Sequence, residues 1–149
     1  MPQATSRTVL LVEDDEFDRR FARDILASTC EDCEIVTLAD GQEMLEWVDE
    51  HGLHEVGFVL LDLKMPRMGG LRALEELRRR GLVDVAPIII MSSSNLVSDI
   101  KRAYELGAVA YLTKPINHLE YREAVQGLGV FWTKYNTPRS YVLDAGERP

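Results

Sequence analysis

Five side chains that could share one phosphate chemistry follow four short apolar stretches of this 149-residue chain. They are two acids after TVLLV, an aspartate after FVLL, a serine after IIIM and a lysine just beyond VAYL: Glu13, Asp14, Asp62, Ser92 and Lys114. Clustered carboxylates repel one another unless a cation neutralises them, and Mg²⁺ prefers oxygen ligands. With the metal bound, one carboxylate could attack a phosphoryl group while the lysine and the hydroxyl offset charge on the phosphoryl oxygens. This chemistry requires a fold that brings all five together.

A parallel sheet would bring these side chains to one edge. Five stretches with the apolar or β-branched character of short strands alternate with five segments of helical spacing. Strands are expected at 8–12, 34–38, 58–61, 88–91 and 109–112, and helices at about 17–26, 41–50, 70–80, 96–106 and 118–135, the fourth capped by Asn95. This repeat predicts an α/β fold with right-handed crossovers and helices on both faces of the sheet. Open sheets of this kind bind ligands at the carboxyl ends of their strands, where Asp62 lies.

Length and composition indicate one domain in the cytoplasm. Residues 1–7 are expected to be a disordered leader, 8–136 the domain and 137–149 a C-terminal tail. No run approaches the ~20 apolar residues of a membrane span, and the N-terminus has no apolar signal region, so no membrane partner is expected. The net charge of −8 argues against nucleic acid as a partner, because phosphates attract basic surfaces.

The two cysteines of the chain, Cys30 and Cys33, have the spacing C-x-x-C. A redox motif of this spacing should open a helix, whereas this one follows a helix and precedes a strand. A zinc site with His51 and His54 is an alternative, although His-x-x-His is tighter than the usual finger spacing. Free thiols and solvated histidines are favoured over both.

The motifs of the chain resemble those of the response-regulator receiver domains of two-component signalling. LLVEDD, LLDLKMPRMGG, IIIMSS and YLTKP occur in that family's order and spacing, over residues 8 to about 135. The resemblance implies a flavodoxin-like (βα)5 sandwich, like that of CheY, with sheet order 2-1-3-4-5. It also implies a single-domain response regulator that accepts a phosphoryl group from a sensor histidine kinase, with Mg²⁺ as cofactor.

The same resemblance assigns roles around the phosphoryl group. Asp62 is the phosphoacceptor and a metal ligand. Asp14 binds Mg²⁺ directly, Glu13 assists through water, and the backbone carbonyl of Lys64 completes the protein ligands. Lys114 contacts the phosphoryl group, and the bond from Lys114 to the following proline is expected to be cis.

Four further roles come from the family. Ser92 is the hydroxyl switch that moves toward the phosphoryl oxygens, and Tyr111 is the aromatic switch that turns inward with it. An ordinary core position is the alternative for Tyr111. Lys64 and Ser94 tune the loss of the phosphoryl group by controlling the access of water, and the long Lys64 side chain predicts slow autodephosphorylation.

The C-terminal segment LGVFWTKYNTPRSY resembles the ending of stand-alone receivers that include phytochrome-associated regulators. Phe131, Trp132 and Tyr135 are more large rings than one covered helix face needs, so they are expected to form an interface; a wide core helix is the alternative. The expected assembly is a homodimer through the fourth helix, fifth strand and fifth helix, with residues 141–143 reaching the partner. A phytochrome-type kinase is the expected phosphoryl donor.

Three other functions fit parts of the pattern less well. A flavodoxin-like cofactor binder needs a phosphate-cradling loop after its first strand, where this chain has three acids. A metal-dependent phosphatase usually has a second acid two residues after its nucleophile, where this chain has Lys64. An interaction domain with a silent site does not need the complete set of five groups. The chain is therefore predicted not to be an enzyme beyond its own phosphorylation and dephosphorylation.

Overall fold

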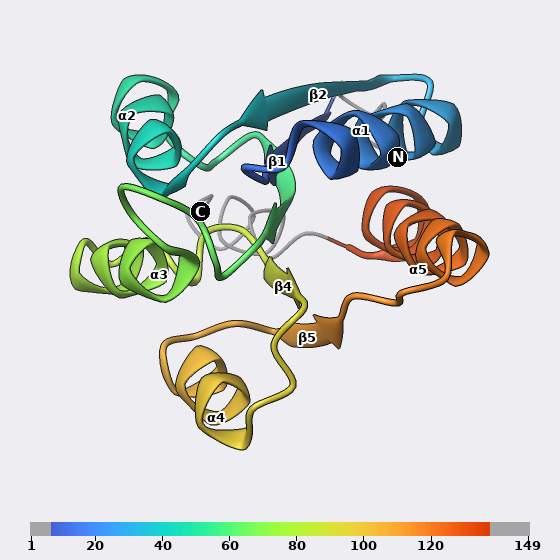
Figure 1. Cartoon of the computed structure of the whole chain (residues 1–149). Coiled ribbons are helices and arrows are strands. Elements are labelled where there is room, and N and C mark those ends of the chain that lie inside the picture. The colour runs from blue at the N-terminus through green and yellow to red at the C-terminus, as the bar shows by residue number, and fades with distance from the viewer. Residues whose placement is uncertain (1–6, 138–149) are drawn as a thin grey trace, which may run out of the picture.

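A computed structural model describes residues 7–137 of the chain (Figure 1). Strands and helices alternate throughout, and the last helix continues into a π-helical turn. The elements are β1 (Arg7–Val12), α1 (Glu16–Thr29), β2 (Cys33–Leu38), α2 (Gly41–His51), β3 (Val56–Leu61), α3 (Gly70–Arg79), β4 (Ile88–Ser92), α4 (Val97–Glu105), β5 (Ala110–Thr113), α5 (His118–Val130) and η1 (Phe131–Tyr135).

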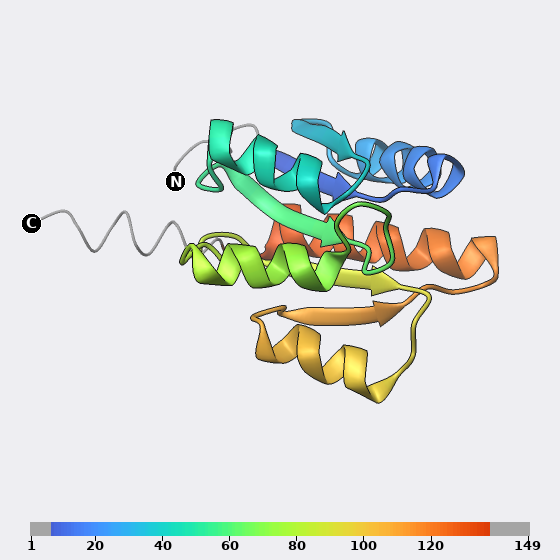
Figure 2. The same ribbon diagram turned by 60° about the vertical axis from the view of Figure 1, so that its left-hand side comes forward.

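The five strands form one parallel sheet in the order β2-β1-β3-β4-β5. Helices α1 and α5 cover one face, and α2, α3 and α4 cover the other (Figures 1 and 2). The predicted α/β class and strand order are thereby confirmed. Because every strand runs the same way, all five carboxyl ends lie at one edge of the sheet.

The central strand β3 is buried along its whole length, which explains its unbroken apolar sequence. Alternate residues of β3 point to opposite faces. Val59 and Leu61 join the apolar cluster under α2, α3 and α4. Phe58 and Leu60 join the cluster under α1 and α5. The strand is therefore held firmly on both sides up to Asp62, the residue that follows it.

Several predicted boundaries differ from the structure. Arg7 belongs to β1, not to the leader, and its guanidinium lies 3.5 Å and 3.4 Å from the carbonyl oxygens of Trp132 and Thr133. The last helix ends at Val130 and continues as the π-helical turn instead of running regularly to residue 135. The rest of the predicted leader and the tail from residue 138 lie outside the described residues.

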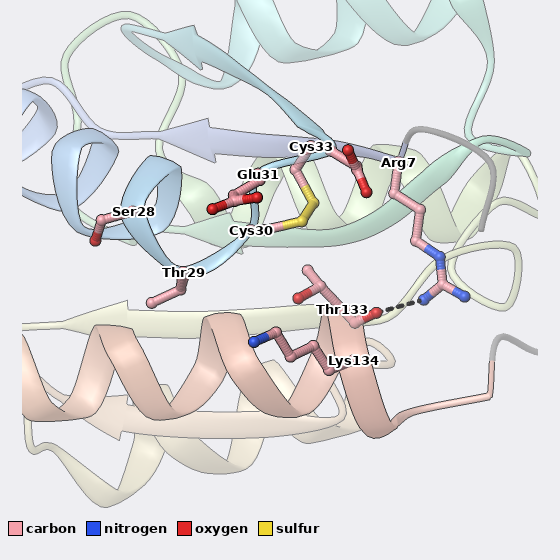
Figure 3. A pocket seen from close by; sticks show the side chains of 9 residues that line it. Arg7, Ser28, Thr29, Cys30, Glu31, Cys33, Thr133 and Lys134 are labelled. Carbon is pink, nitrogen blue, oxygen red and sulfur yellow. Dashed lines mark hydrogen bonds between the residues drawn. A yellow bond between two sulfur atoms is a disulfide. The ribbon is translucent and has the colours of Figure 1, made fainter.

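Two local predictions are wrong. Cys30 and Cys33 form a disulfide instead of free thiols, which also excludes them as zinc ligands in this state (Figure 3). Their Cα atoms are 5.4 Å apart, a normal separation for a disulfide, and a cavity of about 510 Å³ lies beside the bond. The Lys114–Pro115 bond is trans, the form that an X–Pro bond favours by about 0.5–1 kcal/mol.

No helix within residues 7–137 has the length and apolarity to span a bilayer.

Candidate functional site

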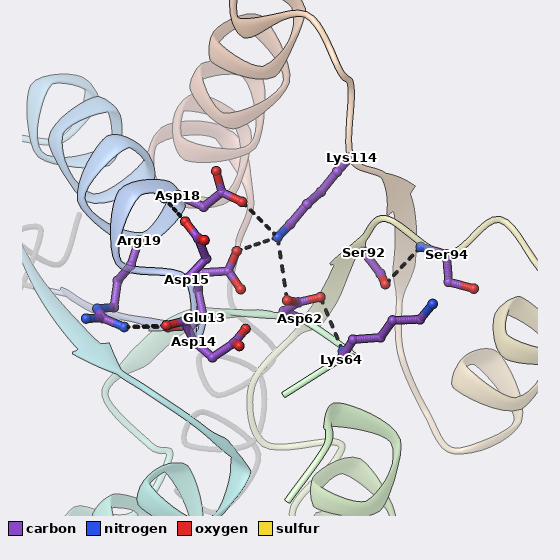
Figure 4. A network of polar contacts seen from close by, with 10 residues as sticks. All are labelled: Glu13, Asp14, Asp15, Asp18, Arg19, Asp62, Lys64, Ser92, Ser94 and Lys114. Carbon is purple, nitrogen blue, oxygen red and sulfur yellow. Dashed lines mark hydrogen bonds and ion pairs between the residues drawn. The ribbon is translucent and has the colours of Figure 1, made fainter. Parts of the chain in front are cut away.

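The predicted site residues meet at the carboxyl edge of the sheet (Figure 4). Glu13 follows β1, Asp62 follows β3, Ser92 ends β4 and Lys114 follows β5. The Lys114 ammonium nitrogen lies 3.5 Å from Asp62 Oδ2 and also contacts Glu13 Oε1. The sheet therefore brings together side chains that are up to 101 residues apart in the sequence.

Three carboxylates in this edge are arranged to hold a metal ion. One oxygen each of Glu13, Asp14 and Asp62 lies within 4.8 Å of the others, and they are the one such group of acids, histidines or cysteines among the described residues. Glu13 and Asp62 are buried, whereas Asp14 is exposed at the mouth of the site. Glu13 Oε2 is buried without a hydrogen-bond partner. A buried acceptor without a donor is costly, and a divalent cation would satisfy it, so the residues fit the expected Mg²⁺.

Burial and charge shift the proton affinities of this cluster. Burial, reinforced by the neighbouring Asp62, raises the pKa of Glu13 far above that of an ordinary glutamate, although Lys114 opposes the shift. Burial alone would lower the pKa of Lys114, but the carboxylates around it outweigh burial and raise the pKa instead. The ammonium therefore stays charged, and Glu13 holds a proton more readily than an ordinary glutamate when no cation is bound.

The loop after Asp62 is built around a very close approach of α3. Gly70, the first residue of α3, donates its N–H to Leu63 O at 2.9 Å. A Cβ atom at position 70 would lie 2.2 Å from the Asp62 carbonyl oxygen, so only glycine fits. The backbone N–H of Lys64 faces Asp62 Oδ1 at a long 3.4 Å, and its side chain is exposed. The backbone carbonyl of Lys64 thus lies in a loop that passes beside Asp62 and whose shape is fixed by the close approach of Gly70.

Comparison with known proteins agrees with this geometry. The family model for the response regulator receiver domain matches residues 9–126. Response regulator Rcp1 of Synechocystis sp. is 30% identical over 130 residues, which are 85% of this chain and 88% of Rcp1. The chain belongs to the response regulator receiver family.

Solved structures of receivers have the same fold. The Mn²⁺-bound form of Rcp1 matches with a TM-score of 0.80 and 30% identity, over 89% of this chain and 98% of that chain. The phosphorylated cyanobacterial phytochrome response regulator RcpA matches with a TM-score of 0.82 and 28% identity, over 90% and 99% of the two chains. The response regulator RPA3017, from red light signalling in R. palustris, matches with a TM-score of 0.73 and 29% identity, over 89% of this chain and 97% of that chain. As a receiver, the chain accepts a phosphoryl group from a histidine kinase onto an aspartate and uses a divalent metal.

The predicted switch residues of the receiver meet at Ser94. The Ser94 N–H donates to Ser92 Oγ at 3.2 Å, and the Ser94 carbonyl accepts from the Tyr111 hydroxyl at 2.8 Å. The Ser94 hydroxyl donates to Asp99 Oδ2 on α4 at 2.5 Å. Tyr111 is half-buried and packs against the core, so it lies inward in this structure. All three polar groups of Ser94 are thus engaged, each with a different element.

Two receiver residues near the site were not anticipated from the sequence. Asp18 Oδ2 lies 3.3 Å from Lys114 Nζ and gives that ammonium a third acidic neighbour. Arg19 donates to the carbonyl oxygens of Glu13 and Asp14 at 2.9 Å and 3.3 Å, and so holds the loop that carries the acids. The sequence carried no signal for Asp18, because it lies in the first turn of α1, where an acid is common in any helix.

The three rings at the end of the chain lie away from the five groups of the site. Phe131 and Tyr135 are 51% and 75% exposed. Trp132 is half-buried and packs against the cluster under α1 and α5, so part of the core alternative holds for it. Phe131 and Trp132 contact each other edge to face with centroids 5.0 Å apart. Two of the three rings therefore remain available to a partner.

Proposed function

We propose that Asp62 is the phosphoacceptor of this receiver and that Mg²⁺ is held by Asp62, Asp14 and the Lys64 carbonyl, with Glu13 assisting through water. The observation that carries this assignment is the position of Asp62. It is buried at the end of the central strand, within 4.8 Å of the other two acids and 3.5 Å from the Lys114 ammonium. A phosphoryl group on Asp62 would therefore lie beside the acids that hold the metal and beside the positive charge of Lys114.

Asp62 acts as a nucleophile in this proposal. A carboxylate oxygen of Asp62 attacks the phosphorus of a kinase phosphohistidine, the P–N bond breaks as the P–O bond forms, and the imidazole leaves and takes up a proton. The metal, when bound, neutralises charge on the phosphoryl oxygens. Lys114, which contacts Glu13, Asp18 and Asp62, turns toward the phosphoryl group, and the Ser92 hydroxyl donates to another of its oxygens. Apart from its own phosphorylation and dephosphorylation, the domain catalyses nothing.

Intact-protein mass spectrometry tests the acceptor. After incubation with acetyl phosphate and Mg²⁺, the wild type is expected to carry one added phosphoryl group and Asp62→Asn none. Asp49→Asn, on the distant part of α2, serves as a matched aspartate control and should be phosphorylated like the wild type. Equal labelling of wild type and Asp62→Asn would refute the assignment.

Lys64 and Ser94 are proposed to set the lifetime of the phosphoryl group. The Lys64 side chain runs from beside Asp62 toward Ser92 and Ser94, so it can crowd the path of an attacking water (Figure 4). Lys64→Ala is expected to shorten the lifetime several-fold, measured as the loss of label after the phosphodonor is removed. Lys101→Ala, which removes an exposed lysine of α4, is the control. A lifetime in Lys64→Ala no shorter than that of the wild type would exclude the crowding argument.

A phytochrome-type histidine kinase is the proposed donor. Of the similar proteins, RcpA is a phytochrome response regulator and RPA3017 acts in red light signalling. The proposed setting is the cytoplasm, and the net charge of −8 disfavours nucleic acid as a target. A phosphotransfer profile against purified kinases tests the donor. Transfer to Asp62 should be fastest from a light-sensing kinase, and a faster reaction with an unrelated kinase would count against it.

A homodimer through α4, β5 and α5 is the proposed assembly. This face carries large apolar side chains in water, and an exposed apolar surface favours association with another protein. They are Leu96, Val97, Tyr104, Ile116, Leu119 and, just beyond α5, Phe131 and Tyr135. The arm expected at residues 141–143 lies outside the described residues. Sedimentation with and without beryllium fluoride, a phosphoryl mimic, should show a dimer in at least one state, and a monomer in both would exclude it.

A further inference from the structure

Arg67 is the one non-glycine residue with positive φ among residues 7–137. Its φ is 60°, and it lies in the loop between Asp62 and α3. A left-handed backbone is unfavourable for a residue that has a Cβ atom, so it persists only where the surrounding structure fixes it. The contacts that fix Arg67 therefore indicate what the loop is built to do.

Arg67 is fixed by a buried carboxylate from another element. Its Nε donates to Asp40 Oδ2 at 2.7 Å, and the Asp40 side chain is only 6% exposed. The other oxygen of Asp40 accepts the Glu43 N–H at 2.9 Å and caps α2. Burial alone would raise the pKa of Asp40, but the Arg67 guanidinium and the backbone donors outweigh it and hold the pKa below its usual value. Asp40 is thus a charged, immobile anchor.

The backbone of the same loop is attached at two more points. Gly41 N donates to Met68 O at 3.0 Å, and a Cβ at position 41 would come within 2.9 Å of that oxygen. The start of α2 therefore lies directly against the loop. At the other end, Gly70 N donates to Leu63 O. The loop of residues 63–70 is held by α2 on one side and by α3 on the other, with Lys64 between the attachments.

We propose that the Arg67–Asp40 ion pair is a latch that fixes the loop of residues 63–70 and thereby holds the Lys64 carbonyl in place for the divalent metal. Arg67 is a positioning residue and not a ligand, because its guanidinium is committed to Asp40. The proposal rests on the proposed role of the Lys64 carbonyl. Without the latch, the loop must be ordered each time a metal binds, and the entropy of ordering weakens the affinity.

Binding of Mn²⁺, followed through the electron paramagnetic resonance signal of the free ion, measures this effect without phosphorylation. Arg67→Gln removes the charge of the latch, and Asp40→Asn removes it from the other side while keeping an oxygen for the cap. Each is expected to weaken Mn²⁺ binding by about tenfold, as loss of an outer-shell partner does in other metal sites. The double variant should bind Mn²⁺ no more weakly than either single variant, because the two single variants and the double variant all lose the same Arg67–Asp40 ion pair.

Arg80→Gln is the matched control. Arg80 pairs with Asp49 and also joins the end of α3 to α2, but it lies away from the loop. It should lower the melting temperature less than Arg67→Gln does, because its partner Asp49 is exposed whereas Asp40 is buried, and it should leave Mn²⁺ binding unchanged. Excess Mg²⁺ should restore the acetyl phosphate reaction of Arg67→Gln, since only the affinity is affected.

The outcomes separate the latch from the proposed function. Mn²⁺ binding that is lost in Asp62→Asn but intact in Arg67→Gln overturns the latch alone. An equal loss of affinity in Arg80→Gln also overturns it, because the effect would then come from general loosening. A wild type that does not bind Mn²⁺ overturns the metal site of the proposed function together with the latch.

Discussion

Glu13 is the residue whose surroundings say most about the metal. It is buried, one of its oxygens has no partner, and its pKa is raised by burial and by Asp62. A divalent cation repels the proton of a nearby carboxyl group, so a cation that binds beside Glu13, even through water, has to displace that proton. Metal binding and the protonation of Glu13 are therefore linked.

The affinity for Mn²⁺ or Mg²⁺ is accordingly expected to rise with pH. Below the raised pKa of Glu13 the metal competes with a proton, so the affinity should increase by up to about tenfold per pH unit between pH 6 and 8. The same sign applies to the metal-free protein. The native state holds the proton of Glu13 more tightly than the unfolded chain, so the contribution of Glu13 to stability is greatest below the ordinary glutamate pKa and is lost as the pH rises through the shifted one.

Metal titrations at pH 6, 7 and 8 check this expectation. Glu13→Gln cannot release a proton, so its affinity should vary much less with pH, even if it is weaker throughout. An affinity of the wild type that is constant across this range would contradict the linkage.

Residue types and strand-end positions were enough to predict the acids, Ser92 and Lys114 at one edge, because a parallel sheet leaves them nowhere else to lie. They were not enough to predict the Arg67–Asp40 pair. That contact depends on a left-handed residue in a loop, and an arginine at such a position carries no signal in the sequence. Likewise, Asp18 reads as an ordinary acid in the first turn of α1, and only the structure shows its contact with Lys114.

At the scale of elements, the glycines that begin and interrupt helices differ sharply in their surroundings. Gly70 lets α3 start against the strand-end loop, where a Cβ would be 2.2 Å from Asp62 O and 2.9 Å from the Leu63 Cα. Gly127, inside α5, has nothing within 4 Å of the position where a Cβ would lie. The same substitution should therefore have opposite effects at the two sites.

Gly70→Ala is expected to lower the free energy of unfolding by about 3 kcal/mol, because backbone atoms must move to admit the methyl group. Gly127→Ala is expected to raise it by about 0.5–1 kcal/mol, since alanine favours the helix and meets no obstacle. Chemical denaturation measures both. A Gly70→Ala protein as stable as the wild type would show that the loop can give way there.

Periodicity predicted the existence and order of the elements, but some of their ends depend on distant contacts. The π-helical turn η1 forms where Arg7, at the other end of the chain, reaches the carbonyl oxygens of Trp132 and Thr133. No local pattern reports that contact. Similarly, Leu96 takes the N-cap position of α4 without a side-chain cap, and Asn95 does not serve as expected. The Ser94 Oγ instead accepts the N–H of Leu96 itself, just before the helix begins.

At the scale of the whole molecule, two apolar clusters clamp the sheet, and the Cys30–Cys33 disulfide closes the turn from α1 into the edge strand β2. A disulfide stabilises mainly by restricting the unfolded chain, and even a four-residue loop gives about 2 kcal/mol in that model. For a domain of this size, that corresponds to about 4–8 °C in melting temperature. Cys33 also packs at the border of the cluster under α1 and α5.

Melting curves with and without dithiothreitol test this contribution. The reduced wild type should melt about 4–8 °C lower than the oxidised protein and match a Cys30→Ser, Cys33→Ser double variant. The double variant should not respond to the reductant. A wild type with one melting temperature under both conditions would show that the bond adds no stability.

The engagement of Ser94 on three sides has a consequence for how a signal would be read. If the Ser92 hydroxyl turns away toward a phosphoryl oxygen, the Ser94 N–H loses its acceptor, and the contacts of Ser94 with Tyr111 and Asp99 cannot adjust one at a time. Intermediate arrangements would leave polar groups of Ser94 without hydrogen-bond partners, so the conformations of the protein should divide into a few discrete populations. Modification would then change how many molecules occupy each population and leave the amplitude of the movement the same. When these populations exchange slowly, a nuclear magnetic resonance spectrum shows them as paired peaks of changing height, not as one peak that drifts.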